Sequence, residues 1–424
     1  MLHSTREYQM SRNMNTRRSL YIICLLLLSA VGNKLDAQTV VKSVRQANDS
    51  TNHALIHQIG FDVRPGYVAP TNSFLEGDNA QRQKIDRSLS LHLKYAFQFS
   101  KDSYLGRLYP HAYQGIGVSH NTFYNSAELG NPVAVYAFQG APIVRLSSCL
   151  SLDYEWNFGA SFGWKQYDEH SNWYNDAIGS KINAYINTNF YLNYILSKEL
   201  DLTAGVDLTH FSNGNTRFPN AGLNTIGLKV GLVYNFNRNG DLFSKPFFQP
   251  PVPRFPRHIS YDVVLFGSWR RKGVYVGEGQ IAAPGAFAVA GFNINPMYNF
   301  GYNFRAGVSV DGVYDESANI YADPSSSSTE QFYRPPLSYQ LALGLSARAE
   351  YVMPYFTVGI GLGGNVIHRG GDLKGLYQVL ALKIEVTRSS FIHIGYNLQN
   401  FHTPNYLMLG IGYRFHNKYP TFHR

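Results

Sequence analysis

A strict alternation of apolar and polar residues over long segments is the feature that most constrains what this chain can fold into. From residue 149 to residue 163 every second side chain is apolar, and the side chains between them are polar or small. A period of two puts the apolar set on one face of a β-strand. Strands of soluble sandwiches rarely hold such a long apolar face, whereas a membrane-spanning strand of about 9–11 residues requires one. The apolar positions are Leu150, Leu152, Tyr154, Trp156, Phe158, Ala160 and Phe162.

The same alternation recurs along most of the chain. It is clear again at residues 341–351 and 407–415, and the last segment ends in the aromatic pair Tyr413 and Phe415. Tyrosine and phenylalanine cluster near segment ends, where the interfacial girdle of a barrel lies. Counting such segments gives roughly 14–16 strands. We therefore predict an all-β fold, a transmembrane antiparallel β-barrel of the outer-membrane type.

The composition excludes three other classes of protein. Aromatic residues make up 15% of the 424 residues, which is too many for a disordered chain. Two cysteines cannot build a disulfide scaffold. The long apolar run at residues 20–31 is too short to cross a bilayer as a helix. A β-rich protein therefore remains, and its surface is poor in charge, since 15% of its residues are charged.

The N-terminal segment has the form of a secretory signal. Arg17 and Arg18 precede an apolar run over residues 19–30, and a plausible cleavage site follows at Ala37. We expect residues 1–37 to be a signal peptide that is removed near Ala37. The segment holds five basic and two acidic residues, so its removal lowers the formal net charge from +9 to +6. We expect the exported chain to be a multi-pass β-barrel in the outer membrane of a Gram-negative bacterium.

A proline-rich connection divides the mature chain into two blocks. We place the first β-barrel block at residues 38–240, the connection at 241–257 and the second block at 258–424. Proline is excluded from central strands, so the connection lies outside the sheet. Each block can hold about eight strands, which leaves open one wide barrel or two tandem 8-stranded barrels. We favour the single wide barrel, because it pairs every strand without a second closure.

Two polar residues end the apolar stripe of one predicted strand. Even positions from residue 200 to residue 208 are apolar, and His210 and Ser212 follow on the same face. Side chains two apart on a strand point the same way, so these two can approach hydrogen-bonding distance. The next strand also keeps its apolar face on even positions and carries Asn224 near its start. A turn centred near Phe218 would set Asn224 opposite Ser212 and diagonal to His210.

These three side chains match the parts of a serine hydrolase site. Ser212 is the candidate nucleophile, and His210 is the base that accepts its proton. Asn224 is the candidate third member, which accepts the other imidazole proton, a role that an amide can fill. The oxyanion of the reaction needs hydrogen-bond donors close by. The candidate donors follow directly in the chain, and they are Asn213, Gly214 and Asn215.

The segment around these residues resembles a known family of outer-membrane enzymes. His210-Phe-Ser-Asn213, followed by Pro219-Asn-Ala-Gly-Leu-Asn224, is similar to the His-x-Ser-Asn and Pro-Asn-x-Gly signature of the lipid A 3-O-deacylase (PagL) and acyloxyacyl hydrolase family. The resemblance implies an outer-membrane β-barrel esterase whose serine and histidine lie on the lipid-facing outside, at the outer leaflet. It also implies that the reaction is hydrolysis of the ester-linked acyl chain at the 3 position of lipid A.

The sequence departs from the family's pattern at two points. The family's acidic third member falls near Asn224, which is not acidic, so Glu128 is a second candidate for that role. The family's typical barrel is small, whereas this chain carries a second block without His-x-Ser-Asn. Two alternatives therefore stay open. One is a non-catalytic barrel, a pore or scaffold that retains a relic motif, and the other is an outer-membrane phospholipase.

Charge and motifs indicate the partners of the protein. A mature chain of net charge +6 suits anionic lipopolysaccharide and other outer-membrane lipids, with Arg217 near the site as a phosphate contact. We find no cysteine-rich metal spacing, nucleotide-binding loop or dinucleotide fingerprint, so we expect no cofactor, no metal and no nucleic-acid partner. The sequence leaves the oligomeric state, the acyl position and the acyl length open.

Overall fold

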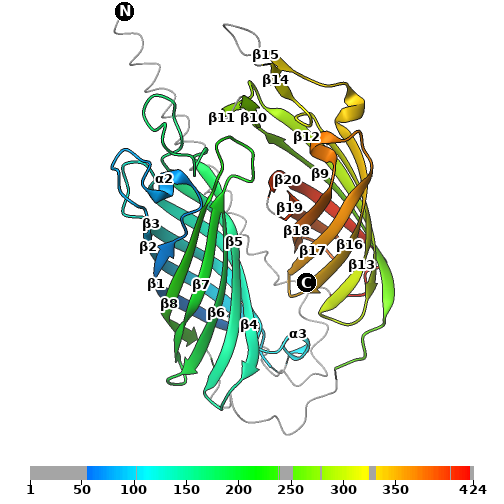
Figure 1. Ribbon diagram of the computed structural model, residues 1–424. Coiled ribbons are helices and arrows are strands. Elements are labelled where there is room, and N and C mark those ends of the chain that lie inside the picture. Colours follow the sequence, from blue (N-terminus) through cyan, green and yellow to red (C-terminus); the bar gives the residue numbers. More distant parts are fainter. Residues whose placement is uncertain are drawn as a thin grey trace, which may run out of the picture. The chain divides into compact units, whose positions relative to one another are not determined.

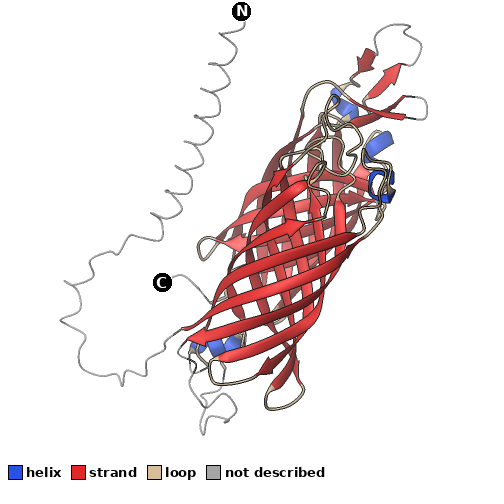
Figure 2. Cartoon of the chain, turned by 90° about the vertical axis from the view of Figure 1, so that its left-hand side faces the viewer, coloured by secondary structure: helices blue, strands red, loops and turns tan. Residues whose placement is uncertain are grey.

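The chain folds almost entirely into β-structure. The computed structural model describes residues 55–101, 103–236, 238, 252–276, 279–323, 331–401 and 403–420. Within these ranges the strands close into two antiparallel barrels of eight strands each (Figure 1). Among the described residues, helical structure is confined to short turns near the ends of the strands (Figure 2). The predicted signal peptide and most of the proline-rich connection lie outside the described residues.

Strands β1 to β8 form the first barrel, and each pairs antiparallel with the next. The sheet closes because β1 also pairs with β8, from His57 opposite Phe236 to Val68 opposite Thr225. A sheet closed in this way has no unpaired edge. The bounds are Ile56–Val68 (β1), Arg87–Gln98 (β2), Tyr113–Thr122 (β3), Gly130–Arg145 (β4), Leu150–Trp164 (β5), Ile182–Ile195 (β6), Leu200–Ser212 (β7) and Leu223–Phe236 (β8).

Eight later strands form the second barrel, which closes where β9 pairs with β20. Two small hairpins lie between these strands in the sequence, formed by β10 (Gly273–Val276) with β11 (Gly279–Ala282) and by β14 (Tyr321–Asp323) with β15 (Gln331–Tyr333). The bounds of the barrel strands are His258–Arg270 (β9), Phe287–Asn299 (β12), Phe304–Asp315 (β13), Leu341–Val352 (β16), Phe356–Ile367 (β17), Leu376–Glu385 (β18), Ser390–Gln399 (β19) and Thr403–Phe415 (β20).

The two closures correct the arrangement that we favoured from the sequence. The all-β barrel class is confirmed, but the strands form two tandem 8-stranded barrels, the alternative, rather than one wide barrel. The reason is that β8 pairs back onto β1, so neither strand keeps a free edge for the second block. Alternation along a strand defines its two faces but not its partner, which is why the sequence left both arrangements open.

The exteriors of both barrels are apolar, and their interiors are polar. Leu93 on β2, Ile116 on β3 and Leu265 on β9 are 60%, 65% and 60% exposed. Asp62 on β1 and Asp262 on β9 are fully buried. Soluble proteins show the opposite distribution. The exterior matches the outward-facing apolar band of a transmembrane β-barrel.

Ion pairs fill the middle of the first barrel. Asp62 lies 2.8 Å from Arg64 and 2.9 Å from Lys94, and Lys94 lies 3.1 Å from Glu155 on β5. All four side chains are almost completely buried. Buried charges are tolerated when they are paired. The pairs therefore tie β1, β2 and β5 together across the lumen.

Aromatic side chains fill the lumen beside the end of β7. The ring of Phe211 lies 5.1 Å from that of Trp164, 5.5 Å from that of Tyr185 and 5.9 Å from that of Phe123, centroid to centroid. Phe74, from the short helix α2 (Ser73–Glu76), belongs to the same buried cluster. This end of the first barrel is therefore packed with side chains.

The second barrel has an ionic interior of the same kind. Asp262 lies 2.9 Å from Arg305, 2.8 Å from Lys383 and 2.9 Å from Arg414. All four side chains are almost completely buried. Asp62 and Asp262 each lie on the first strand of their barrel. Each lumen is thus held by its own buried carboxylate, which gathers cations from other strands.

Short helices and turns connect the strands. α3 (Tyr104–Leu108) joins β2 to β3, while η1 (Leu337–Tyr339) precedes β16 and η2 (Gly371–Leu373) precedes β18. The side chain of Asn72 caps α2, because its oxygen accepts a hydrogen bond from the backbone N–H of Leu75 at 3.0 Å. No helix in the part of the chain that the structure describes is long and apolar enough to cross a membrane.

Candidate active site

His210 and Ser212 lie at the end of β7, on the outside of the first barrel. Phe211 between them points into the lumen, where its side chain is 1% exposed among aromatic rings. Successive side chains of a strand alternate between the two faces, so the burial of Phe211 turns both neighbours outward. Both are half-buried. Aromatic packing inside the barrel thus orients the candidate site outside it.

Two hydrogen bonds connect Ser212, His210 and Asn224. His210 Nε2 lies 2.9 Å from Ser212 Oγ, and His210 Nδ1 lies 2.7 Å from Asn224 Oδ1. An amide oxygen accepts hydrogen bonds and cannot donate them, so the imidazole proton sits on Nδ1 and is donated to Asn224. Nε2 then accepts the hydroxyl proton of Ser212. Such an arrangement can supply a nucleophile, a base and a residue that orients the base.

The register of β7 and β8 differs from the one that we expected. Asn224 lies directly opposite His210, and not opposite Ser212. The turn is therefore centred at residue 217 rather than near Phe218. A directly opposite pair lies closer than a diagonal one, which favours the contact between amide and imidazole. On the other side of β7, Ser212 lies opposite Ala184 of β6.

The candidate site borders an apolar surface. Leu208 on β7 and Ile226 on β8 are 52% and 54% exposed on the face that carries His210. Ile186 of β6, opposite His210, is 42% exposed. The hydroxyl of Ser212 therefore lies beside an apolar face of the barrel.

The loop between β7 and β8 is organised around the buried side chain of Asn213. The backbone N–H of Asn213 donates to Asn220 Oδ1 at 2.9 Å, and its amide nitrogen donates to the carbonyl oxygen of Arg217 at 2.8 Å. We expected Asn213 to donate hydrogen bonds to an oxyanion. Its backbone N–H and its side-chain amide each donate a hydrogen bond within the loop instead. Gly214 and Asn215 follow with positive φ angles. The N–H of Gly214 has no hydrogen-bond partner among the residues that the structure describes.

The loop at residues 165–181, between β5 and β6, forms hydrogen bonds with the loop between β7 and β8. Gln166 Oε1 accepts a hydrogen bond from Arg217 Nη1 at 3.2 Å, so the guanidinium that we expected to contact phosphate is held here by an amide. The carbonyl oxygen of Ala177 accepts from the N–H of Gly222 at 3.0 Å. The two loops therefore form one connected structure beside the candidate site.

Glu128, the second candidate for the third member, occupies a different place. Its carboxylate accepts hydrogen bonds from the backbone N–H of Ala80 and the side chain of Asn125, both at 2.9 Å. These contacts tie together the first two loops at this end of the barrel. The geometry brings Asn224 to the imidazole of His210, and it leaves Glu128 in a structural role.

Two residues of the β7–β8 loop contribute to the site although the sequence analysis gave them no role. Asn220 accepts the hydrogen bond from Asn213, and Gly222 lies against the imidazole of His210. Both belong to the Pro-Asn-x-Gly segment, which was the signal that could have found them. A motif marks positions in the sequence without stating what they contact.

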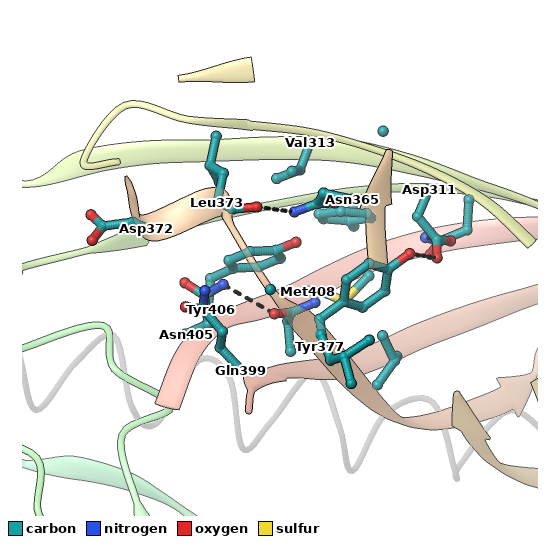
Figure 3. Close-up of a pocket in the computed structure, with 17 residues that line it drawn as sticks. Asp311, Val313, Asn365, Asp372, Leu373, Tyr377, Gln399, Asn405, Tyr406 and Met408 are labelled. Atoms are coloured by element: carbon teal, nitrogen blue, oxygen red, sulfur yellow. Dashed lines mark hydrogen bonds between the residues drawn. The ribbon is translucent and has the colours of Figure 1, made fainter. Parts of the chain in front are cut away.

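Two cavities inside the barrels lie apart from the candidate site. In the second barrel a cavity of about 20 Å³ is lined by residues that include Asp311 and Tyr377, whose hydroxyl donates to the carboxylate at 2.6 Å (Figure 3). Such a volume holds about one water molecule. A cavity of about 100 Å³ in the first barrel is lined by residues that include Lys94 and Lys229. Ser212 lines neither cavity, so the candidate site is a surface site.

A metal centre has no support from the described residues. Among them, no three histidine, cysteine, aspartate or glutamate side chains gather in a group that could hold a metal ion. The hydrogen bonds of His210 engage both of its ring nitrogens, which would otherwise be the metal-binding atoms.

Two family models match the chain, one in each barrel. The model of lipid A 3-O-deacylase (PagL) matches residues 87–233, and that of the acyloxyacyl hydrolase C-terminal domain matches residues 259–417. The first range contains β7, β8 and the loop between them. The chain belongs to the lipid A 3-O-deacylase (PagL) family. Membership in the PagL family makes it a hydrolase of the lipid A deacylase type.

The second family model also explains the block that departed from a small barrel. The match to the acyloxyacyl hydrolase C-terminal domain, residues 259–417, spans the strands of the second barrel. The two matches therefore contain strands of both barrels, while β1 lies outside them.

Comparison with solved structures gives matches to the PagL-family chain at low sequence identity and low TM-score. Neisserial surface protein A is 8% identical with a TM-score of 0.28, covering 42% of this chain and 97% of that one. Omp33, an outer membrane protein of Acinetobacter baumannii, is 9% identical with a TM-score of 0.16, covering 85% and 98%. A mutant of the TodX monoaromatic hydrocarbon channel is 10% identical with a TM-score of 0.18, covering 87% and 91%. No protein with a curated description matches the sequence.

Proposed function

We propose that the protein is an outer-membrane esterase that removes the 3-O-linked acyl chain of lipid A, with Ser212 as nucleophile and His210 as base. The observation that carries the proposal is the pair of hydrogen bonds through His210, at 2.9 Å to Ser212 and 2.7 Å to Asn224, on the outside of the barrel. Family membership supports the substrate class. The apolar surface around the site supports an approach of the substrate from the membrane.

The reaction follows from the roles of these side chains. As Ser212 Oγ attacks the ester carbonyl carbon, its proton passes to His210 Nε2. The bond between that carbon and the sugar oxygen then breaks, and His210 returns the proton to the sugar oxygen. Water, deprotonated by the same nitrogen, attacks the carbonyl carbon of the acyl-enzyme. The bond from that carbon to Ser212 Oγ then breaks, His210 returns the proton to Ser212 Oγ, and the fatty acid is released. The net reaction consumes one water for each ester that is cleaved.

The amide of Asn224 orients the imidazole and adds no charge. Its oxygen holds the Nδ1 proton at 2.7 Å, which keeps the lone pair of Nε2 directed at Ser212. A carboxylate in that place would also stabilise the imidazolium that forms during the reaction. The proposed enzyme therefore relies on orientation of its base rather than on a charged partner.

Stabilisation of the oxyanion is assigned to the start of the loop after β7. The N–H of Gly214, two residues after Ser212, is a donor without a partner among the described residues. Backbone donors close to a nucleophile can stabilise the negative charge of a tetrahedral intermediate. The backbone N–H of Asn213 and one N–H of its side-chain amide are engaged within the loop.

Substrate binding is proposed at the membrane boundary. In this proposal the acyl chains of lipopolysaccharide lie on the apolar surface around Leu208 and Ile226. Its phosphates then lie near the loop between β7 and β8. Arg217 is the candidate contact for a phosphate, in which case its guanidinium must share or exchange its hydrogen bond with Gln166. Export by a signal peptide cleaved near Ala37 belongs to the same proposal.

A non-catalytic pore is the less favoured alternative. Ion pairs around Asp62 cross the lumen of the first barrel, aromatic rings around Phe211 pack its end beside β7, and the cavity between strands is about 100 Å³. A water-filled channel needs an open, polar lumen. The packed lumen therefore favours a barrel that works on its outer surface.

Mass spectrometry of lipid A tests the proposal. The full chain and its Ser212→Ala variant are expressed in Gram-negative cells that lack such an activity, and both are checked for heat-modifiable migration as folded barrels. We expect the wild type to remove one acyl chain from the 3 position and the variant to leave lipid A intact. Release of fatty acid from phospholipids, with lipid A unchanged, would assign a phospholipase. Unchanged lipid A and phospholipids would assign a scaffold.

A further inference from the structure

The structure assigns a positioning role to Gly222, whose backbone packs against the imidazole of His210. This inference rests on the proposed function, because it concerns the geometry of the same base. The side-chain atom nearest to a β-carbon at this position would be His210 Cε1, so Gly222 acts through His210. The residue is therefore a positioning residue and not a catalytic one.

The contact is defined by what a side chain at this position would meet. A β-carbon on Gly222 would lie 3.2 Å from His210 Cε1, 3.1 Å from the carbonyl oxygen of Phe211 and 3.7 Å from Ser212 Cβ. Carbon atoms at van der Waals contact are separated by about 3.5–4.0 Å. Any side chain larger than hydrogen therefore presses on the imidazole ring.

The direction of that pressure matters for the chemistry. Cε1 is the ring carbon between Nδ1 and Nε2, the two nitrogens that bind Asn224 and Ser212. A push on this carbon moves both nitrogens together. Both hydrogen bonds then lengthen or bend, and hydrogen bonds weaken steeply when their geometry is lost.

The backbone of Gly222 cannot easily move away from the imidazole of His210. The N–H of Gly222 donates to the carbonyl oxygen of Ala177 at 3.0 Å, and the N–H of Ala221 donates to that of Asp176 at 3.1 Å. The next residue, Leu223, is completely buried and packs in the aromatic cluster of the lumen. The backbone around position 222 is thus held from both sides, so an added side chain displaces His210 rather than the loop.

Gly222 also has a φ angle of +74°, which by itself favours glycine. Two substitutions distinguish the effect of the positive φ angle from the effect of contact with the imidazole of His210. Asparagine tolerates positive φ angles but carries a β-carbon. Gly163 in the same barrel has a φ angle of +91°, and a β-carbon there would meet nothing closer than 3.7 Å. Gly163→Ala is therefore a matched control for backbone strain without contact to His210.

The experiment uses the full chain folded in detergent micelles, with lipid A as substrate. For Gly222→Ala and Gly222→Asn we expect kcat to fall on the order of 100-fold, because small displacements of a catalytic group have effects of that size. KM should stay nearly unchanged, and heat-modifiable migration should show folded barrels. Gly163→Ala should keep the wild-type kcat. Wild-type kcat in Gly222→Asn, or an equal loss of kcat in Gly163→Ala, would overturn the inference.

A second measurement does not depend on activity. Nitrogen NMR of ¹⁵N-histidine-labelled protein, assigned with His210→Ala, reports which ring nitrogen of His210 carries the proton. We expect one tautomer in the wild type and in Gly163→Ala, and a mixture of tautomers in Gly222→Asn. An unchanged tautomer in Gly222→Asn would overturn the positioning role. If the wild type hydrolyses no lipid A, the proposed function fails, while this spectrum still decides the role of Gly222.

Discussion

At the residue scale, the amide at position 224 determines how strong a base the site can form. Asn224 Oδ1 lies 2.7 Å from His210 Nδ1, so a hydrogen bond orients the ring. The amide lacks the negative charge that stabilises an imidazolium. We therefore expect an active enzyme whose rate is limited because the imidazolium that forms on His210 has no negatively charged partner.

Removing either reacting side chain should abolish hydrolysis without unfolding the barrel. Ser212→Ala deletes the nucleophile, and His210→Ala leaves the hydroxyl without a base, at which point serine is a weak nucleophile. We expect kcat to fall by about 1,000-fold or more in each variant. Fatty-acid release from purified protein measures this, with the double variant as the control. A double variant that is far slower than either single one would mean that the two residues do not act as a unit.

Restoring a carboxylate at position 224 should raise the activity. Asn224→Glu places a negative charge beside the imidazole, which favours its protonated form. We expect the maximal rate to be kept or increased, and the acid limb of the pH–rate profile to move to higher pH. The sign follows because a base that stays protonated to higher pH becomes active at higher pH. Asn224→Ala should lower kcat less than His210→Ala, and a silent Asn224→Ala would remove Asn224 from the site.

At the scale of elements, each strand is defined by the contrast between its two faces. On β8, Val230 and Leu228 are 53% and 61% exposed on the outside, while Lys229 between them is 1% exposed in the lumen. A lysine inside and aliphatic residues outside require lipid around the strand. The same contrast runs through both barrels.

A charge placed on the outside of β8 should therefore be costly. Val230 lies near the middle of the strand, where an arginine facing lipid destabilises a barrel by about 2–4 kcal/mol. We expect Val230→Arg to lower the free energy of unfolding by that amount in lipid vesicles. Val230→Ala, the control, should lower it much less, and urea titration followed by tryptophan fluorescence measures both. Equal effects of the two variants would place Val230 outside the lipid-facing band.

At the scale of the whole molecule, two closed barrels replace one continuous sheet. Each barrel closes its own hydrogen-bond network, through β1 with β8 and through β9 with β20. Each also has its own buried carboxylate, Asp62 or Asp262, paired with cations from the same barrel. The two barrels should therefore respond separately to the loss of their ion pairs.

Asp62→Ala should destabilise the first barrel alone. It leaves Lys94 and Arg64 buried without their main partner, and breaking a buried pair costs about 3–5 kcal/mol. Trp269 on β9 reports on the second barrel, and Trp164 on β5 reports on the first. In variants that keep only Trp164 or only Trp269 of the four tryptophans, we expect the unfolding transition seen by Trp164 to shift in Asp62→Ala and that seen by Trp269 to shift in Asp262→Ala. A common shift of both signals would indicate one cooperative unit.

Much of the candidate site was predicted from the sequence, but its exact contacts were not. The parity of His210 and Ser212 on an apolar stripe follows from the period of two, because a strand must alternate its faces. The partner of His210 depended on the centre of the β7–β8 turn, and a shift of that centre moved Asn224 from opposite Ser212 to opposite His210. A loop of that length does not fix register by local chemistry. Long-range pairing therefore decided which side chains touch.

The sequence by itself determined the membrane-type β-barrel, the two faces of each strand and the face on which His210 and Ser212 lie. These properties depend on alternation, which is local. The tertiary structure alone decided that β8 returns to β1 rather than continuing to β9, that Gly222 meets the imidazole, and that the donors of Asn213 are used within its loop. The physical reason is common to all three. Strand closure and loop packing are contacts between residues far apart in the chain, and no local pattern of residues encodes which of them will meet.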